Sequence, residues 1–181
     1  MTPRPATPMD IEAVQAIYAH HVLHGLGTFE ENPPSADEMS LRYDAVRARG
    51  LPWLVAEHDG RVAGYAYAGP FRPRAAYRYT VEDSVYVSPE AVGQGIGRSL
   101  LDAVIAECER LGLRQMVAVI GDSGNAASIA LHRACGFEFK ATLPGLGFKF
   151  GRWVDVVWMQ RALGPGDGQG PDSPDSHPQG G

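Results

Sequence analysis

The sequence lacks several features that would assign it to large functional classes. Its 181 residues contain no run of basic side chains and carry a formal net charge of −5, which argues against a nucleic-acid partner. No apolar run approaches the roughly 18 residues of a membrane-spanning helix, and the N-terminal residues do not resemble a secretory leader. We therefore expect no membrane association.

Cysteine is also scarce, because Cys108 and Cys135 are the two in the chain. Both fall within helical patterns, which favours small, reduced core residues over a disulfide framework and indicates a cytoplasmic protein. The hydrophobic fraction of 44% suits one globular domain. From Gly164 onward no aliphatic or aromatic side chain occurs, so we predict a domain over residues 1–163 and a disordered tail over residues 164–181.

The most informative stretch is residues 81–101, VEDSVYVSPEAVGQGIGRSLL. Its β-branched and aromatic start predicts a strand, which Pro89 ends because proline has no N–H for the ladder. Three glycines follow at alternate positions: Gly93, Gly95 and Gly97. Apolar residues at helical spacing come next. A strand, a glycine-rich turn and a helix start together predict a site for phosphate or pyrophosphate, although a glycine-rich turn without a ligand is the alternative.

Two common nucleotide motifs do not fit this turn. A dinucleotide fingerprint would need its third glycine where Arg98 stands, and the P-loop pattern G-x-x-x-x-G-K-[ST] is absent. The window 92–97, VGQGIG, instead resembles the acyl-CoA loop Q/R-x-x-G-x-G/A of the GNAT acetyltransferases. It departs at its first position, where Val92 replaces Gln or Arg.

The remaining patterns predict a regular order of elements. Helical spacing predicts helices over residues 10–24, 35–49, 96–111 and 125–135. Apolar runs and alternation predict strands over residues 52–57, 61–68, 81–87, 115–120, 137–142 and 153–160, after a short extended start. Asp59-Gly60 predicts a hairpin turn, and residues 143–151 are predicted to form a glycine-rich loop.

This order is that of a GNAT domain, and the resemblance extends over nearly all of residues 4–162. The runs PWLVAE, AYAGP, TVEDSVYVSP, VAVIG and FKFGRWVDVVWMQ are similar to the phosphinothricin and methionine sulfoximine N-acetyltransferases. The resemblance implies an α/β fold with a mixed, mostly antiparallel sheet that is flanked by helices and splayed at the central strands. It also implies acetyl-CoA as co-substrate, a small amino acid analogue as acceptor, no metal, and a homodimer formed through the C-terminal strands and loops.

Two residues are candidates for catalysis. The resemblance implies that Glu82, in the T-V-E run, is the base that accepts the amine proton; a strand carboxylate facing solvent is the alternative. Asp83 should point to the opposite face of a regular strand and serve as a negative control. His132 stands in L-H-x-x-x-G-F, where many GNAT enzymes have tyrosine, and is either the general acid or a structural histidine.

The resemblance also implies the binding residues. The pantetheine arm is expected at Val85, Tyr86 and Val87, whose backbone N–H groups also suit the oxyanion. The pyrophosphate is expected at Gly93, Gln94, Gly95, Ile96, Gly97 and Arg98, with a further contact from Asn125. The amino acid pocket is expected at Phe29, Arg72, Arg74, Tyr77 and Gly121.

Two stretches have plainer alternatives. His20 and His24 share a helix face, but a metal site needs a third ligand and none is spaced to supply one, so solvated histidines are the better interpretation. Residues 69–80 hold three arginines with aromatic neighbours and no acidic residue, which suits either an anionic substrate group or a solvated basic loop.

Three hypotheses of function remain. The first is acetylation of a phosphinothricin-like or methionine sulfoximine-like amine. The second is acetylation of a different amine, such as a peptide N-terminus or a polyamine. The arginine-rich loop argues against a polyamine, and the predicted loops 25–34 and 143–151 suggest a covered site rather than the open groove that a peptide needs. The third is a non-catalytic acyl-CoA-binding module, which would need neither Glu82 nor His132.

Overall fold

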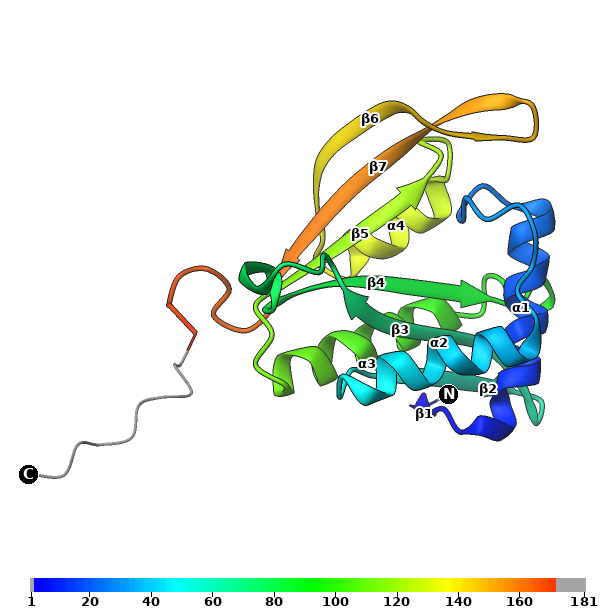
Figure 1. Cartoon of the computed structure of the whole chain (residues 1–181), viewed down its shortest axis with the longest axis horizontal. Coiled ribbons are helices and arrows are strands. Elements are labelled where there is room, and N and C mark those ends of the chain that lie inside the picture. Colours follow the sequence, from blue (N-terminus) through cyan, green and yellow to red (C-terminus); the bar gives the residue numbers. More distant parts are fainter. Residues whose placement is uncertain (1, 172–181) are drawn as a thin grey trace, which may run out of the picture.

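The computed structural model describes residues 2–171 as one layered α/β domain (Figure 1). Seven strands form its sheet: β1 (Arg4–Pro5), β2 (Trp53–His58), β3 (Arg61–Pro70), β4 (Thr80–Val87), β5 (Gln115–Gly121), β6 (Glu138–Lys149) and β7 (Arg152–Ala162). Four α-helices accompany them: α1 (Ile11–His24), α2 (Ala36–Ala48), α3 (Ile96–Arg110) and α4 (Ala126–Ala134). This order of elements is the one that the sequence predicts.

The strands lie in the order β1-β2-β3-β4-β5-β7-β6, and every neighbouring pair is antiparallel except β4 and β5. These two parallel strands pair only where Thr80–Glu82 face Gln115–Val117. Strand β4 then continues to Val87 and β5 to Gly121 without pairing with each other, and Figure 1 shows them diverging. The predicted mixed sheet, splayed at its centre, is therefore confirmed.

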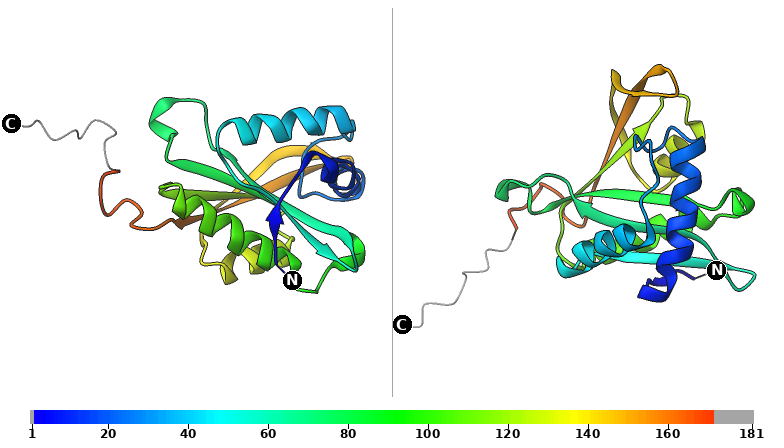
Figure 2. Two further views of the ribbon diagram at one scale, coloured as in Figure 1. Left: turned by 90° about the horizontal axis from the view of Figure 1, so that it is seen from below. Right: turned by 45° about the vertical axis from the view of Figure 1, so that its right-hand side comes forward.

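Helices cover both faces of the sheet. In the left view of Figure 2, α2 lies on one side, and α3 and α4 lie on the other. Helix α3 buries one apolar stripe against the sheet: Ile96, Leu100, Leu101, Val104 and Ile105. The spacing of three to four residues that predicted this helix is thus the spacing of its core face. None of the helices in the described part of the chain has the length and apolarity needed to cross a membrane.

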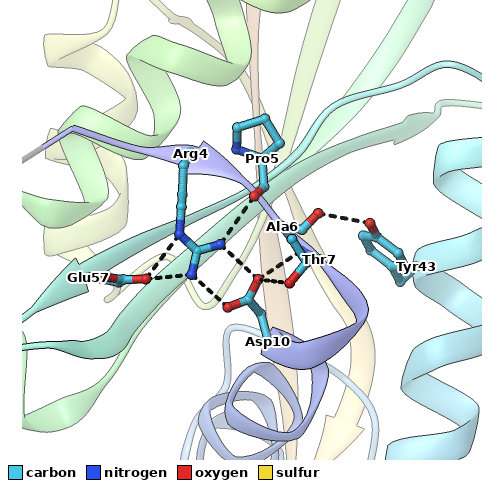
Figure 3. Close-up of polar contacts among 7 residues, drawn as sticks. All are labelled: Arg4, Pro5, Ala6, Thr7, Asp10, Tyr43 and Glu57. Carbon is cyan, nitrogen blue, oxygen red and sulfur yellow. Dashed lines mark hydrogen bonds and ion pairs between the residues drawn. The ribbon is translucent and has the colours of Figure 1, made fainter.

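An ion-pair network fastens the start of the chain (Figure 3). The Arg4 guanidinium donates two 2.8 Å hydrogen bonds to the carboxylate of Asp10 and also contacts Glu57 of β2. Asp10 in turn accepts hydrogen bonds from the backbone N–H and hydroxyl of Thr7. The Arg4 hydrogen bonds hold the pKa of Asp10 well below its usual range, although burial opposes them. The network ties β1, α1 and β2 together.

One of the predicted connections is confirmed and another is wrong. Asp59 and Gly60 both adopt positive φ, 51° and 72°, as the predicted hairpin turn requires. The predicted loop over residues 143–151 is wrong, because β6 continues to Lys149 and pairs with β7 after an irregularity between Leu143 and Gly147. The glycine-rich composition of this segment has a low strand propensity, so the sequence did not predict the strand. Hydrogen bonding to β7 stabilises it instead.

The predicted tail falls partly outside the described residues. Residues 164–171 are described and form turns, with the N–H of Gly166 donating to the carbonyl of Leu163. Residues 172–181 lie outside the described part, so the prediction of a disordered tail and of a domain boundary at 163 stays a prediction.

Candidate active site

A cavity of about 650 Å³ opens where β4 and β5 separate. Predicted catalytic, cofactor and substrate residues share its lining: Glu82, His132, Val85, Tyr86, Val87, Gly93, Gly95, Ile96, Gly97, Arg98, Asn125, Phe29 and Gly121. These residues come from five separate parts of the sequence. The splayed strands bring them together, because the missing β4–β5 pairing leaves a space that reaches into the sheet.

Four predicted residues lie elsewhere. Gln94 lines a second hollow of about 520 Å³ beside the β2–β3 turn. Arg72, Arg74 and Tyr77 stand in the exposed connection between β3 and β4, outside the cavity lining. Tyr77 packs edge-on against Phe71, which packs edge-on against Trp158 of β7. The structure therefore does not join these side chains to the cavity, and their substrate role stays a prediction.

The glycine-rich turn leads directly into α3. Gly93 and Gly95 have φ values of 83° and 77°, which L side chains rarely adopt, and Gly95 is the residue that precedes the helix. Gly97 allows close packing, since a Cβ there would lie 3.3 Å from Leu131 of α4. The first N–H groups of α3 thus face an open turn, and the helix dipole favours an anion there.

The edge of β4 that faces the cavity carries backbone groups without a strand partner. Its other edge pairs with β3 along Gly64–Pro70, whereas pairing with β5 ends at Glu82. Peptide groups between Asp83 and Val87 that point toward β5 are therefore open to a ligand. One side chain approaches this end of β4: the ring Nε2 of His21 lies 2.9 Å from the carbonyl oxygen of Val87. The sequence did not predict His21 as a lining residue, because its partner Val87 stands 66 positions away.

Glu82 is the last residue of β4 that pairs with β5, so its carboxyl group stands at the apex of the splay. Its side chain is only half-buried. Burial raises the pKa of Glu82 above its ordinary value, the neighbouring charge of Asp83 adds to this, and the charge of Arg72 opposes it. A carboxyl group whose pKa is raised toward neutrality is a better proton acceptor than an ordinary one, because proton affinity rises with pKa.

His132 forms a buried ion pair that the sequence did not predict. Its Nε2 lies 3.0 Å from Oδ2 of Asp83, and both side chains are almost fully buried. Its Nδ1 lies 2.7 Å from the carbonyl oxygen of Ser128, one helical turn earlier in α4. Burial acts to lower the pKa of His132, but the hydrogen bond and charge of Asp83 and the bond to Ser128 outweigh it, so the pKa is raised.

These contacts suit a His132 ring that donates from both nitrogens. The carbonyl oxygen of Ser128 can only accept, so Nδ1 carries a proton, and the raised pKa of the ring favours a proton on Nε2 as well. The imidazolium form is therefore favoured. This arrangement excludes a Ser-His-Asp nucleophile, even though the Ser128 hydroxyl lies 3.3 Å from Nδ1, because a protonated Nδ1 cannot take the hydroxyl proton.

Asp83 consequently fails as a negative control. Regular strand geometry does send its side chain to the face opposite Glu82, as expected, but that face is where α4 presents His132. Its Oδ1 is buried and has no hydrogen-bond partner among the described residues. The sequence held no signal for this pair, since the two residues stand 49 positions apart.

The far end of the cavity is closed by the connection between α1 and α2. Phe29 lies there against Gly121, where a Cβ would come within 3.2 Å of the Phe29 ring and 2.0 Å of the carbonyl oxygen of Leu26. Thr28 donates or accepts a 2.8 Å hydrogen bond with the Tyr18 hydroxyl. The predicted substrate residues Phe29 and Gly121 are thus neighbours at one end of the cavity.

Three histidines stand near the C-terminal end of α1. The rings of His20 and His24 lie tilted to each other with centroids 4.9 Å apart near the end of the helix. Within residues 2–171, no group of three or more His, Cys, Asp or Glu side chains is arranged to hold a metal ion. Their position favours solvated residues at a helix C-terminus, where a partial negative charge suits a basic side chain.

Comparisons with known proteins agree with this architecture. A phosphinothricin N-acetyltransferase from Alcaligenes faecalis is 57% identical over 158 residues, covering 87% of this chain and 80% of that protein. An L-methionine sulfoximine/L-methionine sulfone acetyltransferase from Salmonella typhimurium is 45% identical over 163 residues, covering 90% of this chain and 95% of that protein.

The structure of a GNAT superfamily phosphinothricin acetyltransferase from Sinorhizobium meliloti in complex with AcCoA superimposes with a TM-score of 0.92. It is 48% identical and covers 97% of this chain and 96% of that one. The sequence profile of the Acetyltransferase (GNAT) family matches residues 17–137. The chain belongs to the GNAT family of acetyltransferases.

Proposed function

We propose that this enzyme transfers the acetyl group of acetyl-CoA to the amino group of a small amino acid analogue of the phosphinothricin, methionine sulfoximine or methionine sulfone type. The observation that carries the proposal is the position of Glu82, a carboxyl group of raised pKa at the apex of the splayed strands. The names of the relatives supply the acceptor class. Acetylation of phosphinothricin would make the chain a herbicide-resistance enzyme.

The residues around the cavity fit acetyl-CoA. The first N–H groups of α3 and the turn at Gly93, Gly95 and Gly97 suit the pyrophosphate, with Arg98 adding positive charge and Gln94 at the outer side. The unpaired edge of β4 at Val85–Val87 suits the amide groups of the pantetheine arm. Asn125 uses its Oδ1 to cap α4 by accepting from the N–H of Ser128, which leaves its amide NH₂ free toward the cavity.

Glu82 is the proposed base. An α-amino group with a pKa near ~8 is mostly protonated at neutral pH and must lose a proton to attack the thioester carbon. Glu82 accepts that proton, directly or through a water molecule, before the neutral amine forms the nitrogen–carbon bond. The tetrahedral intermediate then collapses, the carbon–sulfur bond breaks, and the second proton that the nitrogen loses goes to the departing CoA thiolate or to water. Backbone N–H groups of β4 beyond Glu82 are the proposed donors to the oxyanion.

His132 is proposed as a fixed positive charge rather than as a free proton donor. Both of its N–H groups already hold Asp83 and Ser128, so neither is available to the departing thiolate in this geometry. An imidazolium on the cavity wall still favours the developing negative charge of a thiolate, whose conjugate acid has a pKa of about 8.5 by analogy with cysteine.

Arg72 and Arg74 are the proposed partners of the anionic groups of the acceptor. The charge of Arg72 acts on the Glu82 carboxyl group, which supports a place for the β3–β4 connection near the reacting end of the cavity. A planar guanidinium pairs well with a carboxylate or a phosphinate. Tyr77 would shield these pairs from water.

A homodimer is proposed from the outer face of the β6–β7 hairpin. Alternate residues Leu146, Phe148 and Phe150 are each more than half exposed, and Trp153 is 69% exposed. Phe148 and Trp153 pair across the strands with their rings edge to face. Large aromatic side chains left on one face of a hairpin are typical of protein interfaces.

We also propose a cytoplasmic location, since both cysteines are free and buried.

The direct test is release of CoA thiol from acetyl-CoA with phosphinothricin, methionine sulfoximine, methionine sulfone, lysine, spermidine and a short peptide as acceptors. Turnover confined to the first three would support the proposed acceptor class. Turnover with the peptide or spermidine alone would keep the family and contradict the acceptor. Binding of acetyl-CoA without turnover of any amine would favour a non-catalytic acyl-CoA-binding module.

A further inference from the structure

Lys149, near the end of β6, is a lysine in an unusual setting. Its side chain is 2% exposed, and its ammonium group donates 2.8 Å hydrogen bonds to the carbonyl oxygens of Gly25 and Thr28. These partners are neutral, and Glu31 and Glu30 act on the lysine only through space. Burial lowers the pKa of Lys149, because removal from water disfavours the charged form of the ammonium group. Burying an ammonium group without a carboxylate contact costs folding free energy, which suggests that Lys149 has a role other than stabilising the fold.

The lysine joins two parts of the chain that are far apart in sequence. Gly25 and Thr28 lie in the connection between α1 and α2, more than 120 positions before Lys149. Figures 1 and 2 show this connection beside the end of β5 and the β6–β7 hairpin. On its other side the connection is held by the Tyr18 hydroxyl, which bonds Thr28 and Glu30, and by Arg42, which pairs with Glu30. Lys149 thus holds this connection from the side of the β6–β7 hairpin, through its bonds to Gly25 and Thr28.

The clamped segment carries Phe29, whose ring fits between two glycines. A Cβ at Gly147 of β6 would lie 2.4 Å from the Phe29 ring, and a Cβ at Gly121 of β5 would lie 3.2 Å from it. Any larger side chain at Gly147 would therefore push the ring away, because contacts below 3.0 Å require movement. Lys149 and Gly147 belong to the same strand, so one strand both holds the segment and receives its aromatic ring.

Phe29 lines the cavity that Glu82 also lines. We propose that Lys149 is a positioning residue for the amine-binding end of the cavity: it holds residues 25–29 so that Phe29 closes that end and limits the size of the acceptor. This inference rests on the proposed acetyltransferase function for its kinetic consequence. Its structural part, the dependence of the segment on Lys149, stands without it.

The kinetic experiment compares Lys149→Met, which keeps the length of the side chain and removes its charge, with Lys140→Met. Lys140 lies on the same strand, pairs with Glu138 and is exposed, so its loss leaves the segment untouched. Lys149→Met should raise KM for the amine about tenfold or more while KM for acetyl-CoA changes less than about twofold, because only the amine end is displaced. Equal changes in both values, or none, would overturn the proposal.

A second measurement needs no substrate. Backbone amides of residues 25–31 should exchange hydrogen faster in Lys149→Met than in the wild type, while the amides of α3 should keep their protection. Unchanged exchange in residues 25–31 would overturn the positioning role. If the wild type acetylated no amine in the panel, the proposed function would fail, and the exchange result would still decide whether Lys149 holds the segment.

Gly147→Ala provides an independent route if Lys149→Met does not fold. This substitution displaces Phe29 without touching the ammonium group. It should reproduce the rise in KM for the amine and also change the ranking of acceptors by side-chain size, since the aromatic wall moves. An unchanged ranking and an unchanged KM would contradict the proposed limit on acceptor size.

Discussion

Asp83 and His132 stand 49 positions apart in sequence, yet Oδ2 of one lies 3.0 Å from Nε2 of the other in the buried wall of the cavity. The pair places the imidazole ring of His132 and the carboxylate of Asp83 side by side behind the splayed strand. Its members come from β4 and α4, and Cys108 of α3 is close enough for the Asp83 charge to act on it. Packing of α4 against β4 thus raises the pKa of the histidine, because it brings the ring to Asp83.

Asp83→Asn should lower the pKa of His132, because the substitution removes the charge that outweighs burial. A histidine whose folded pKa is raised contributes stability that is complete below its unfolded pKa of about 6.5 and is lost as the pH rises through the folded value. The loss of unfolding free energy should therefore be largest at acidic pH, about 3 kcal/mol, and smaller at alkaline pH.

The measurements for this prediction are urea unfolding at several pH values and the NMR titration of the His132 ring. Asp44→Asn, which removes an exposed carboxylate from α2, is the control for net charge and should change neither result. An unaltered His132 titration in Asp83→Asn would contradict the assignment of the imidazolium to this pair.

Glu82→Gln should reduce kcat for the acetylated amine by roughly 10²- to 10⁴-fold, since it removes the proposed proton acceptor and keeps the shape of the side chain. Acetyl-CoA should bind to the variant almost as it does to the wild type, which calorimetry can measure. Undiminished turnover would remove Glu82 from the mechanism, whereas loss of acetyl-CoA binding would point to a damaged cavity.

Arg72→Gln should move the acidic limb of the kcat/KM profile to higher pH. If Glu82 is the base, activity requires its ionised form and rises as the pH passes the pKa of that group. Burial has already raised this pKa and the charge of Arg72 opposes the increase, so removing the charge raises it further. Arg74→Gln is the matched comparison, because Arg74 is not among the groups that act on Glu82. A shift of equal size in both variants would contradict this account.

Gly64→Ala should destabilise the fold by about 1–3 kcal/mol through overpacking between β3 and α3. A Cβ at Gly64 would lie 3.0 Å from Ile96 and from the carbonyl oxygen of Tyr86, and 3.1 Å from Leu100. Gly69→Ala is the control on the same strand, since its Cβ would meet nothing closer than 3.9 Å. Urea unfolding of both variants gives the comparison, and equal destabilisation would contradict the packing argument.

Local physics explains which features the sequence predicts. Helix α3 shows its core face as a spacing pattern, the Asp59-Gly60 turn needs its residue types, and the turn before α3 needs glycines at 93 and 95 for their positive φ. Each of these signals is contained within about one element, so it can be recognised before the chain is folded.

Contacts between distant elements explain what the sequence does not show. The continuation of β6 to Lys149 depends on pairing with β7, and the clamp of Lys149 on Gly25 depends on the α1–α2 connection reaching the hairpin. The exposed setting of Arg74 and Tyr77 is likewise a tertiary result. The glycine-rich and basic composition of these segments indicates only their local propensity, so it does not show which distant residues they contact.

The exposed hairpin face provides the last prediction. If Leu146, Phe148, Phe150 and Trp153 form a homodimer contact, Trp153→Glu should yield a monomer, because a buried charge without a partner opposes association. Leu41→Glu is the control: Leu41 is also 69% exposed but lies on α2, away from the hairpin. Light scattering after gel filtration separates the outcomes. A dimer that persists in Trp153→Glu would place the contact elsewhere, and a monomeric wild type would leave these aromatic residues exposed to solvent without a second copy to cover them.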